Sequence, residues 1–86
     1  MPELYFRRGN AYFNKGDGDH ARTDYDQTIK LKADFSEAYY NRGLVFRKKG
    51  DASSAAADFK KVLELTKDAD LKKQAEDQLK ALGVQP

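Results

Sequence analysis

The side chains best able to do chemistry surround His20, the only histidine in the chain. Asp17 and Asp19 precede it and Asp24 follows it by one helical turn, so these side chains could form a weak site for a divalent metal. The same acidic residues also suit a solvent-exposed helix start, because carboxylates are stabilised by the positive end of the helix dipole. We favour the second interpretation and expect no metal site.

No motif indicates catalysis. Asp17, Gly18 and Asp19 are similar to the opening of a calcium-binding loop, but the later glycine and carboxylate positions of such a loop are wrong. No serine or lysine has a base placed by a recognisable motif, no glycine-rich phosphate loop follows a strand, and there is no cysteine. We therefore expect a protein that is not an enzyme, with no catalytic residues, no cofactor and no small-molecule substrate.

Two basic clusters are the strongest sign of nucleic-acid binding. Arg7 and Arg8 form the first cluster, and Arg47, Lys48 and Lys49 form the second, each with tyrosines nearby. Aromatic rings beside cations are what a protein that binds single-stranded nucleic acid uses. However, the net charge is only +2 and acidic residues are interspersed, which weakens the field. RNA binding is therefore a less favoured alternative.

The length and composition indicate one small, soluble domain. A chain of 86 residues without cysteine must derive its stability from packed apolar faces. No apolar run approaches the ~20 residues of a membrane span, and the N-terminus lacks the pattern of a signal peptide. We expect a cytoplasmic or other intracellular location, and the chain can equally be a segment of a longer protein.

The elements that must position any site form a repeat with an offset of 34 residues. Agreement at one spacing from the start of one helix to the end of the next indicates a structural repeat. The matched pairs are Tyr5 and Tyr39, Arg8 and Arg42, Gly9 and Gly43, Tyr12 and Phe46, Gly16 and Gly50, Asp17 and Asp51, Ala21 and Ala55, Asp24 and Asp58, Tyr25 and Phe59, and Leu31 and Leu65.

Helix-start and helix-stop signals divide the sequence into five predicted helices. The first begins at Pro2 and ends before Gly16, a left-handed cap, and the second runs from a cap at Asp17 to about residue 31. A capping box formed by Asp34 and Glu37 is expected to open the third helix. By the repeat, the fourth helix follows a cap at position 51. A fifth helix starts at position 68 or 70 and ends before a glycine at position 83.

Gly9 and Gly43 lie inside predicted helices, where glycine costs roughly 1 kcal/mol relative to alanine. Their repetition at matched positions indicates close approach of the neighbouring helix. We expect the small residues Ala21 and Ala55 to lie opposite them, with the aromatic residues of the repeat filling the core.

The fifth helix does not continue the repeat pattern. Its apolar stripe of Leu71, Ala75, Leu79 and Leu82 faces away from a charged side. Such a helix is suited to cover the open apolar end of a stack of hairpins.

In this pattern the chain resembles the tetratricopeptide repeat (TPR) family. The family spacing appears twice, as Tyr5, Arg8, Gly9, Tyr12, Ala21 and Tyr25, and as Tyr39, Arg42, Gly43, Phe46, Ala55 and Phe59. The resemblance implies an all-α, right-handed α-solenoid of two antiparallel helix hairpins plus one capping helix. It implies a single domain over 1–86, with repeat one at about 2–35, repeat two at about 36–68 and the capping helix at about 69–83.

The sequence departs from the family pattern in three ways that matter. Thr28 and Val62 replace a small residue late in the second helix of each hairpin, which suggests slightly looser packing there. Arg8 and Arg42 replace an aliphatic residue, which is tolerable if the stem lies on apolar surface while the guanidinium reaches water. Ala33 and Lys67 replace the proline that usually ends the second helix. Helices two and three could then fuse, and two chains could exchange hairpins.

The resemblance also implies a concave groove for peptides, lined by the first helix of each hairpin. Its apolar anchors would supply most of the affinity, its carboxamides would hold a peptide backbone, and its end would be basic. The predicted groove residues are Phe6, Asn10, Phe13, Tyr40, Asn41, Leu44, Arg47 and Lys48.

Two functions remain open at this point. The favoured one is a protein-protein interaction module that binds a peptide of a partner with apolar anchors and some acidic character. The alternative is a structural or self-assembling element, in which Phe6 and Phe13 cover a neighbouring repeat or a second chain.

Overall fold

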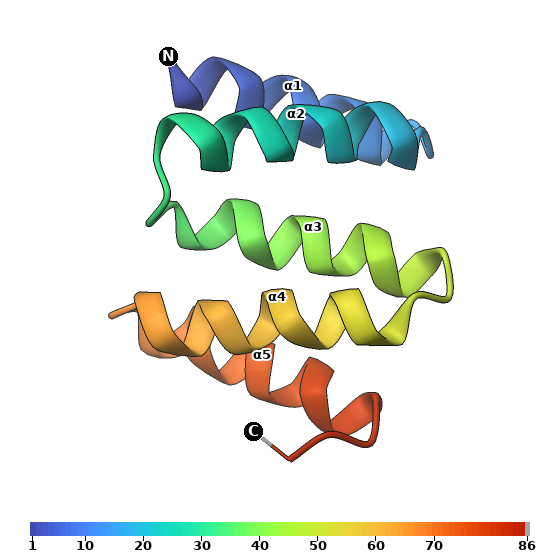
Figure 1. Ribbon diagram of the computed structural model, residues 1–86, viewed down its shortest axis with the longest axis vertical. Coiled ribbons are helices and arrows are strands. Elements are labelled where there is room, and N and C mark those ends of the chain that lie inside the picture. Colours follow the sequence, from blue (N-terminus) through green and yellow to red (C-terminus); the bar gives the residue numbers. More distant parts are fainter. Residues whose placement is uncertain (86) are drawn as a thin grey trace.

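The computed structural model describes residues 1–85, and in this part of the chain it contains five α-helices and no strand. The helices are stacked in chain order along the long axis of the molecule (Figure 1). The closest packing is within the two hairpins, between the first and second and between the third and fourth helices. This confirms the predicted all-α architecture of two helix hairpins and a capping helix. The helices are α1 (Pro2–Asn14), α2 (Gly18–Leu31), α3 (Ser36–Lys48), α4 (Ala52–Leu65) and α5 (Ala69–Ala81).

Most predicted helix ends are confirmed. Gly16 and Gly50 both have φ of 84°, the left-handed conformation that ends a helix without strain only at glycine. The Asp17 carboxylate accepts a hydrogen bond from the backbone N–H of His20 at 3.2 Å, and Asp51 caps α4 in the same way. Asp68 caps α5. The two repeats therefore use the same local chemistry to reverse the chain.

The predicted capping box at the start of α3 is wrong. The N-cap residue is Phe35, and no side chain caps this helix end. The ring of Phe35 instead packs against the ring of Phe6, with centroids 4.8 Å apart. The Tyr39 hydroxyl donates to the backbone carbonyl of Ala33 at 2.9 Å. Aromatic packing and this bond hold the turn, so that α2 ends at Leu31 and does not fuse with α3.

The two helix glycines do allow close packing of the neighbouring helix. A Cβ atom at Gly9 would lie 2.8 Å from the ring of Tyr25, and one at Gly43 would lie 2.7 Å from the ring of Phe59. The nearest atoms thus belong to these aromatic rings and not to Ala21 and Ala55, and both alanines are fully buried. Glycine is needed at these two positions because an aromatic ring of the next helix, Tyr25 or Phe59, occupies the space that a side chain would fill.

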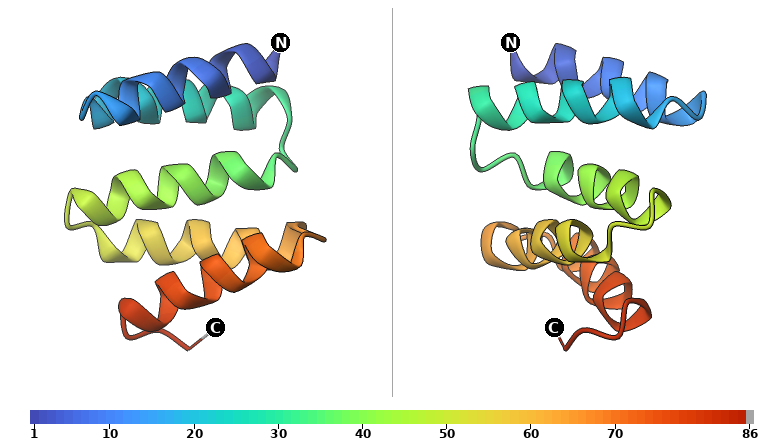
Figure 2. Two further views of the ribbon diagram at one scale, coloured as in Figure 1. Left: turned by 180° about the vertical axis from the view of Figure 1, so that it is seen from behind. Right: turned by 45° about the vertical axis from the view of Figure 1, so that its right-hand side comes forward.

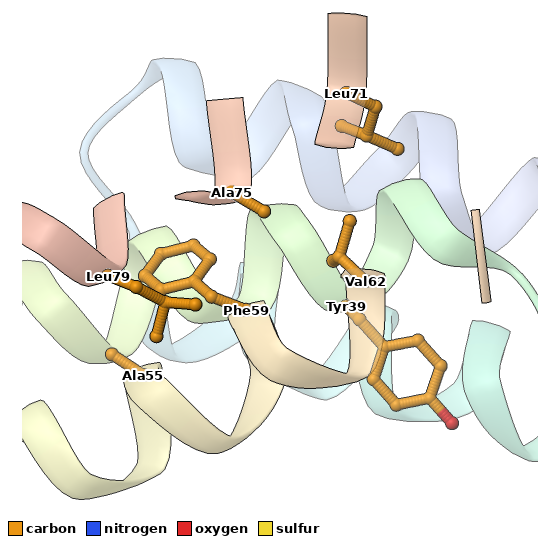
Figure 3. Close-up of a cluster of buried hydrophobic side chains, with 7 residues drawn as sticks. All are labelled: Tyr39, Ala55, Phe59, Val62, Leu71, Ala75 and Leu79. Atoms are coloured by element: carbon orange, nitrogen blue, oxygen red, sulfur yellow. The ribbon is translucent and has the colours of Figure 1, made fainter. Parts of the chain in front are cut away.

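The larger core cluster joins the second hairpin to α5. Figure 3 shows Leu71, Ala75 and Leu79 of α5 beside Phe59 and Val62 of α4. These five residues are at most 9% exposed. The prediction that α5 covers the apolar end of the stack is confirmed, and Figure 2 shows its oblique course across α4. The repeat limits at residues 2–35, 36–68 and 69–83 stay a prediction.

Candidate functional site

Two asparagines join the first helices of the two hairpins. The Asn41 Nδ2 group on α3 donates to the Asn10 Oδ1 atom on α1 at 2.9 Å. The hydroxyl of Tyr25 on α2 donates to the same Oδ1 atom at 2.6 Å. Both lone pairs of that oxygen are therefore used within the protein, and the expectation that the two carboxamides hold a peptide backbone stays a prediction.

The remaining amide atoms of the two joined carboxamides are one donor, on Asn10, and one acceptor, on Asn41. Burial raises the pKa of Tyr25 to about 12, so its hydroxyl keeps its proton near neutral pH and donates it. This donor fixes the Asn10 oxygen towards Tyr25, which leaves the Asn10 Nδ2 group on the other side. Asn41 in turn donates through nitrogen and leaves its oxygen. Within residues 1–85, Asn10 Nδ2 and Asn41 Oδ1 have no hydrogen-bond partner.

The apolar residues predicted for the site lie on the core and are half-buried. The ring of Phe6 packs against Tyr25 with a centroid distance of 5.9 Å, and also against Phe35. The ring of Tyr40 packs against Phe59 at 5.5 Å, and Leu44 lies against the same core cluster. These side chains therefore form a supported surface in place of freely standing anchors.

The basic end of the site is hollowed. The Lys48 Nζ atom lies above the ring of Phe13, 5.7 Å from its centroid. A cavity of about 210 Å³ opens beside this pair. This is smaller than the ~300–1,000 Å³ of typical small-molecule pockets, so it fits a single side chain. Its lining consists of Phe13, Gly16, Gly18, Val45, Lys48 and Lys49.

Sequence reasoning missed the two glycines, Val45 and Lys49 of this cavity. The signal was present in the sequence. Two glycines separated by one residue follow the C-terminal turn of the first helix, and glycines leave room that side chains would fill. Gly16 ends α1 and Gly18 begins α2, and a Cβ atom at Gly18 would be 3.4 Å from Val45.

Gln78 of α5 contacts this surface and was missed. Its side chain donates to the Tyr40 hydroxyl at 3.4 Å and accepts a hydrogen bond from Arg47. The repeat offset could have found it, since Gln78 follows Leu44 by the same 34 residues by which Leu44 follows Asn10. We call the surface formed by the eight predicted residues the α1–α3 face, and Gln78 borders it.

The arginines that depart from the family pattern hold buried carboxylates. Arg8 donates to both oxygens of Asp24 at 2.8 and 2.7 Å, and Arg42 donates to both oxygens of Asp58 at 2.9 and 2.8 Å. These hydrogen bonds raise the pKa of each guanidinium above its usual range. Arg42 also binds Asp26 at 2.9 Å. The expected exposed guanidinium is therefore wrong for Arg42, whose side chain is 21% exposed, whereas the Arg8 side chain is 60% exposed.

His20 takes part in a helix start. Its Nδ1 atom lies 2.6 Å from an Asp17 oxygen, and its ring stacks on Tyr12 with centroids 4.9 Å apart. Hydrogen bonding from the backbone N–H of His20 lowers the pKa of Asp17. In the part of the chain that the structure describes, no group of three histidine or acidic side chains could hold a metal ion.

Stacked helix hairpins with a supported, partly polar face define the class of helical-repeat interaction proteins. Models of one family match the chain, a TPR repeat model over residues 9–50 and a tetratricopeptide repeat model over residues 36–69. The chain belongs to the tetratricopeptide repeat family. Such repeats are generally protein-protein interaction modules without enzymatic activity. No curated protein matches the chain. None of the helices in residues 1–85 has both the length and the apolar character to cross a membrane.

Proposed function

We propose that the α1–α3 face binds an extended peptide segment of a partner protein. The observation that carries this proposal is the hydrogen-bonded pair of Asn10 and Asn41, whose Nδ2 and Oδ1 atoms respectively have no partner within residues 1–85. A peptide unit presents one carbonyl acceptor and one N–H donor, which match these two groups whatever the peptide sequence. Tyr25 orients the pair before any ligand arrives, so little conformational freedom is lost on binding.

Apolar side chains on both sides of the amide pair supply the affinity. Phe6 and Phe13 lie on α1, and Tyr40 and Leu44 lie on α3. Each is packed on the core or against a neighbouring side chain and only partly exposed, so binding does not have to order it. Anchors of this kind contribute more to binding than the surrounding polar contacts.

The basic end selects the character of the ligand. Arg47 and Lys48 are exposed on the last turn of α3, and Lys49 follows them beside the cavity. An acidic residue of the peptide is attracted to this end. A single side chain of the ligand occupies the cavity beside Phe13.

Peptides selected from a displayed random library on the immobilised protein test this proposal. Because Asn10 and Asn41 carry side-chain NH₂ groups, their resonances report directly on the amide pair in ¹⁵N-labelled protein. We expect a selected peptide to shift both side-chain signals and to contain apolar residues with at least one acid. Peptide binding that leaves both signals in place contradicts the proposal.

Charge reversal at the basic end provides the affinity measurement. Phe6 and Tyr40 pack against core aromatics, so their replacement also disturbs the fold, whereas Arg47 and Lys48 are exposed. The double variant Arg47→Glu with Lys48→Glu is expected to bind an acidic peptide about tenfold or more weakly. The matched control reverses Lys60 and Lys67, exposed on and after α4.

The alternative of self-assembly is separated by the same signals. If two chains join through the α1–α3 face, the Asn10 and Asn41 side-chain signals change with protein concentration. The molar mass in solution doubles at the same time. If the signals do not change with concentration and the molar mass is that of a monomer, self-assembly through the α1–α3 face is excluded.

A further inference from the structure

A second surface lies on α1, on residues that the peptide site does not use. Two hollows of about 430 and 200 Å³ adjoin each other there and share Arg8. The surface includes large exposed apolar groups, with Leu4 61% exposed. We call it the α1 outer face, and its residues are Met1, Leu4, Tyr5, Arg8, Ala11, Tyr12 and Lys15.

The repeat provides a filled copy of this surface. Thirty-four residues later, the same positions on α3 are packed against α2. Leu4, Tyr5 and Ala11 correspond to Ala38, Tyr39 and Val45, which are 0%, 8% and 1% exposed. On α3, then, a helix covers the positions that are open on α1.

The charges on the two surfaces also correspond. On α3, Arg42 binds Asp58 through Nε and Nη2, and its Nη1 atom reaches Asp26 of α2. Lys49 forms an ion pair with Asp19 of α2.

On α1, Arg8 binds Asp24 through the same two nitrogens, Nε and Nη2. Within residues 1–85, Arg8 Nη1 and Lys15 Nζ have no partner. Two cations are thus left at the positions where α3 meets two carboxylates seven residues apart.

We propose that the α1 outer face docks an amphipathic helix of a partner protein, with α2-like carboxylates seven residues apart and apolar side chains between them. The carboxylates pair with Arg8 and Lys15, and the apolar side chains enter the two hollows. Burial of Leu4 and its neighbours supplies the affinity, and the paired charges fix the direction and register of the helix.

The helices of a second copy of the chain are poor matches. On α5, Asp70 and Asp77 are also seven residues apart, but the apolar side chains of that helix are buried against α4. The α2 surface that carries Asp19 and Asp26 is already covered by α3. The equivalent positions of α4 are Ser53 and Lys60, so a docked α4 would bring Lys60 against Arg8 with like charge.

A helical peptide with the sequence of residues 17–32 is the probe. A hydrocarbon crosslink replaces its residues at positions 24 and 28, which are buried against α1 in the protein. The crosslink holds the peptide helical and prevents it from taking the place of α2. Binding of the labelled peptide to the full chain is measured by fluorescence anisotropy.

Substitutions in the protein locate the peptide. Leu4→Glu is expected to weaken binding by about tenfold, because it places a charge in an apolar contact. Leu31→Glu, at an exposed leucine elsewhere, is the control and leaves binding unchanged. Equal losses for the two variants overturn the proposal.

A charge swap tests the register. Lys15→Glu is expected to weaken binding of the peptide by about threefold or more, because exposed charge pairs contribute modestly to affinity. A peptide with lysine in place of Asp19 is expected to restore binding to Lys15→Glu protein. Rescue at Lys49→Glu in place of Lys15→Glu shows exchange with α2 and overturns the proposal. A wild-type dimer that Leu4→Glu dissociates assigns the face to a second copy and also overturns it.

Discussion

The two helix hairpins have the same internal contacts and different neighbours. In each, a helix glycine receives an aromatic ring from the next helix, at Gly9 and Tyr25 and again at Gly43 and Phe59. In each, an arginine grips a buried aspartate 16 residues later. Contacts inside a hairpin are therefore set by the repeated sequence, and neighbouring helices add to them.

The second hairpin lies between α2 and α5, whereas α1 of the first hairpin leaves its outer face open. The Arg8 side chain is 60% exposed with one carboxylate partner, and the Arg42 side chain is 21% exposed with two. The same residue pair therefore has a different energetic role when a neighbouring helix covers it. Substitutions at matched positions should separate the two hairpins.

The largest effect is expected from Gly43→Leu. A side chain there meets the ring of Phe59, which α5 holds in place, so neither can move without opening the core. We expect a loss of more than about 3 kcal/mol in the free energy of unfolding, measured by urea denaturation. Gly9→Leu is expected to cost less, because the outer face of α1 is open and this helix can move away from Tyr25.

Gly18→Ala is the matched control for the glycine series. A Cβ atom at Gly18 would lie 3.4 Å from Val45, an ordinary contact, and alanine favours the helix. The variant should unfold at the wild-type urea concentration or slightly above. If Gly43→Leu also unfolds there, the close contact between glycine and ring does not exist in solution.

The next largest effect is expected from Arg42→Ala. It leaves the buried carboxylate of Asp58 without its bidentate partner and also removes the bond to Asp26. Removing one partner of a buried ion pair costs about 3–5 kcal/mol, and the partial exposure of Arg42 places our expectation at about 2–3 kcal/mol. Arg8→Ala should cost less, since water can reach Asp24 from the open side of α1. Urea denaturation of the two variants measures both losses in the free energy of unfolding.

A paired substitution separates charge from packing in this comparison. Arg42→Met with Asp58→Leu removes both charges and keeps apolar volume, so it should be less destabilised than Arg42→Ala alone. Equal losses for Arg8→Ala and Arg42→Ala would mean that the neighbouring helix does not matter to the ion pair.

The fold could be predicted because its signals are local and occur twice. Gly16 and Gly50 end helices through backbone conformation, and Asp17 and Asp51 begin them through a bond three residues along the chain. Neither requires knowledge of a distant contact. The third helix was less well predicted, since Phe35 packs against Phe6 from another hairpin and thereby decides where α3 starts.

The site could be predicted only in part. The helical stripe placed Asn10 and Asn41 on one surface, but it did not show that Tyr25 and Asn41 use the Asn10 oxygen. Nor did it show that Asp24 is buried, because aspartate is usually exposed and its partner lies on a different helix. Hydrogen bonds across helices depend on packing distances that periodicity does not contain.

The smallest expected effect is a difference between the hairpins in how their stability depends on pH, since the first hairpin has Tyr25 where the second has Phe59. Burial raises the pKa of Tyr25 to about 12, above its ordinary value of about 10. A raised folded-state pKa means that the stability from this group is fully present below pH ~10 and is lost as the pH rises through about 12. The loss amounts to about 2 kcal/mol.

Urea denaturation of the wild type and of Tyr25→Phe at pH 9 and pH 12 measures this term. At pH 9 the variant should be less stable, because the Asn10 oxygen loses one of its two donors. At pH 12 the difference in stability between the variant and the wild type should shrink or reverse. Phenylalanine cannot ionise, so the first hairpin of the variant resembles the second hairpin in this respect. Tyr5→Phe, which removes the hydroxyl of a half-buried tyrosine of α1, is the matched control. If Tyr25→Phe keeps the wild-type dependence on pH, ionisation of Tyr25 does not limit the stability of the first hairpin in alkali, and the difference between the hairpins lies in their neighbours alone.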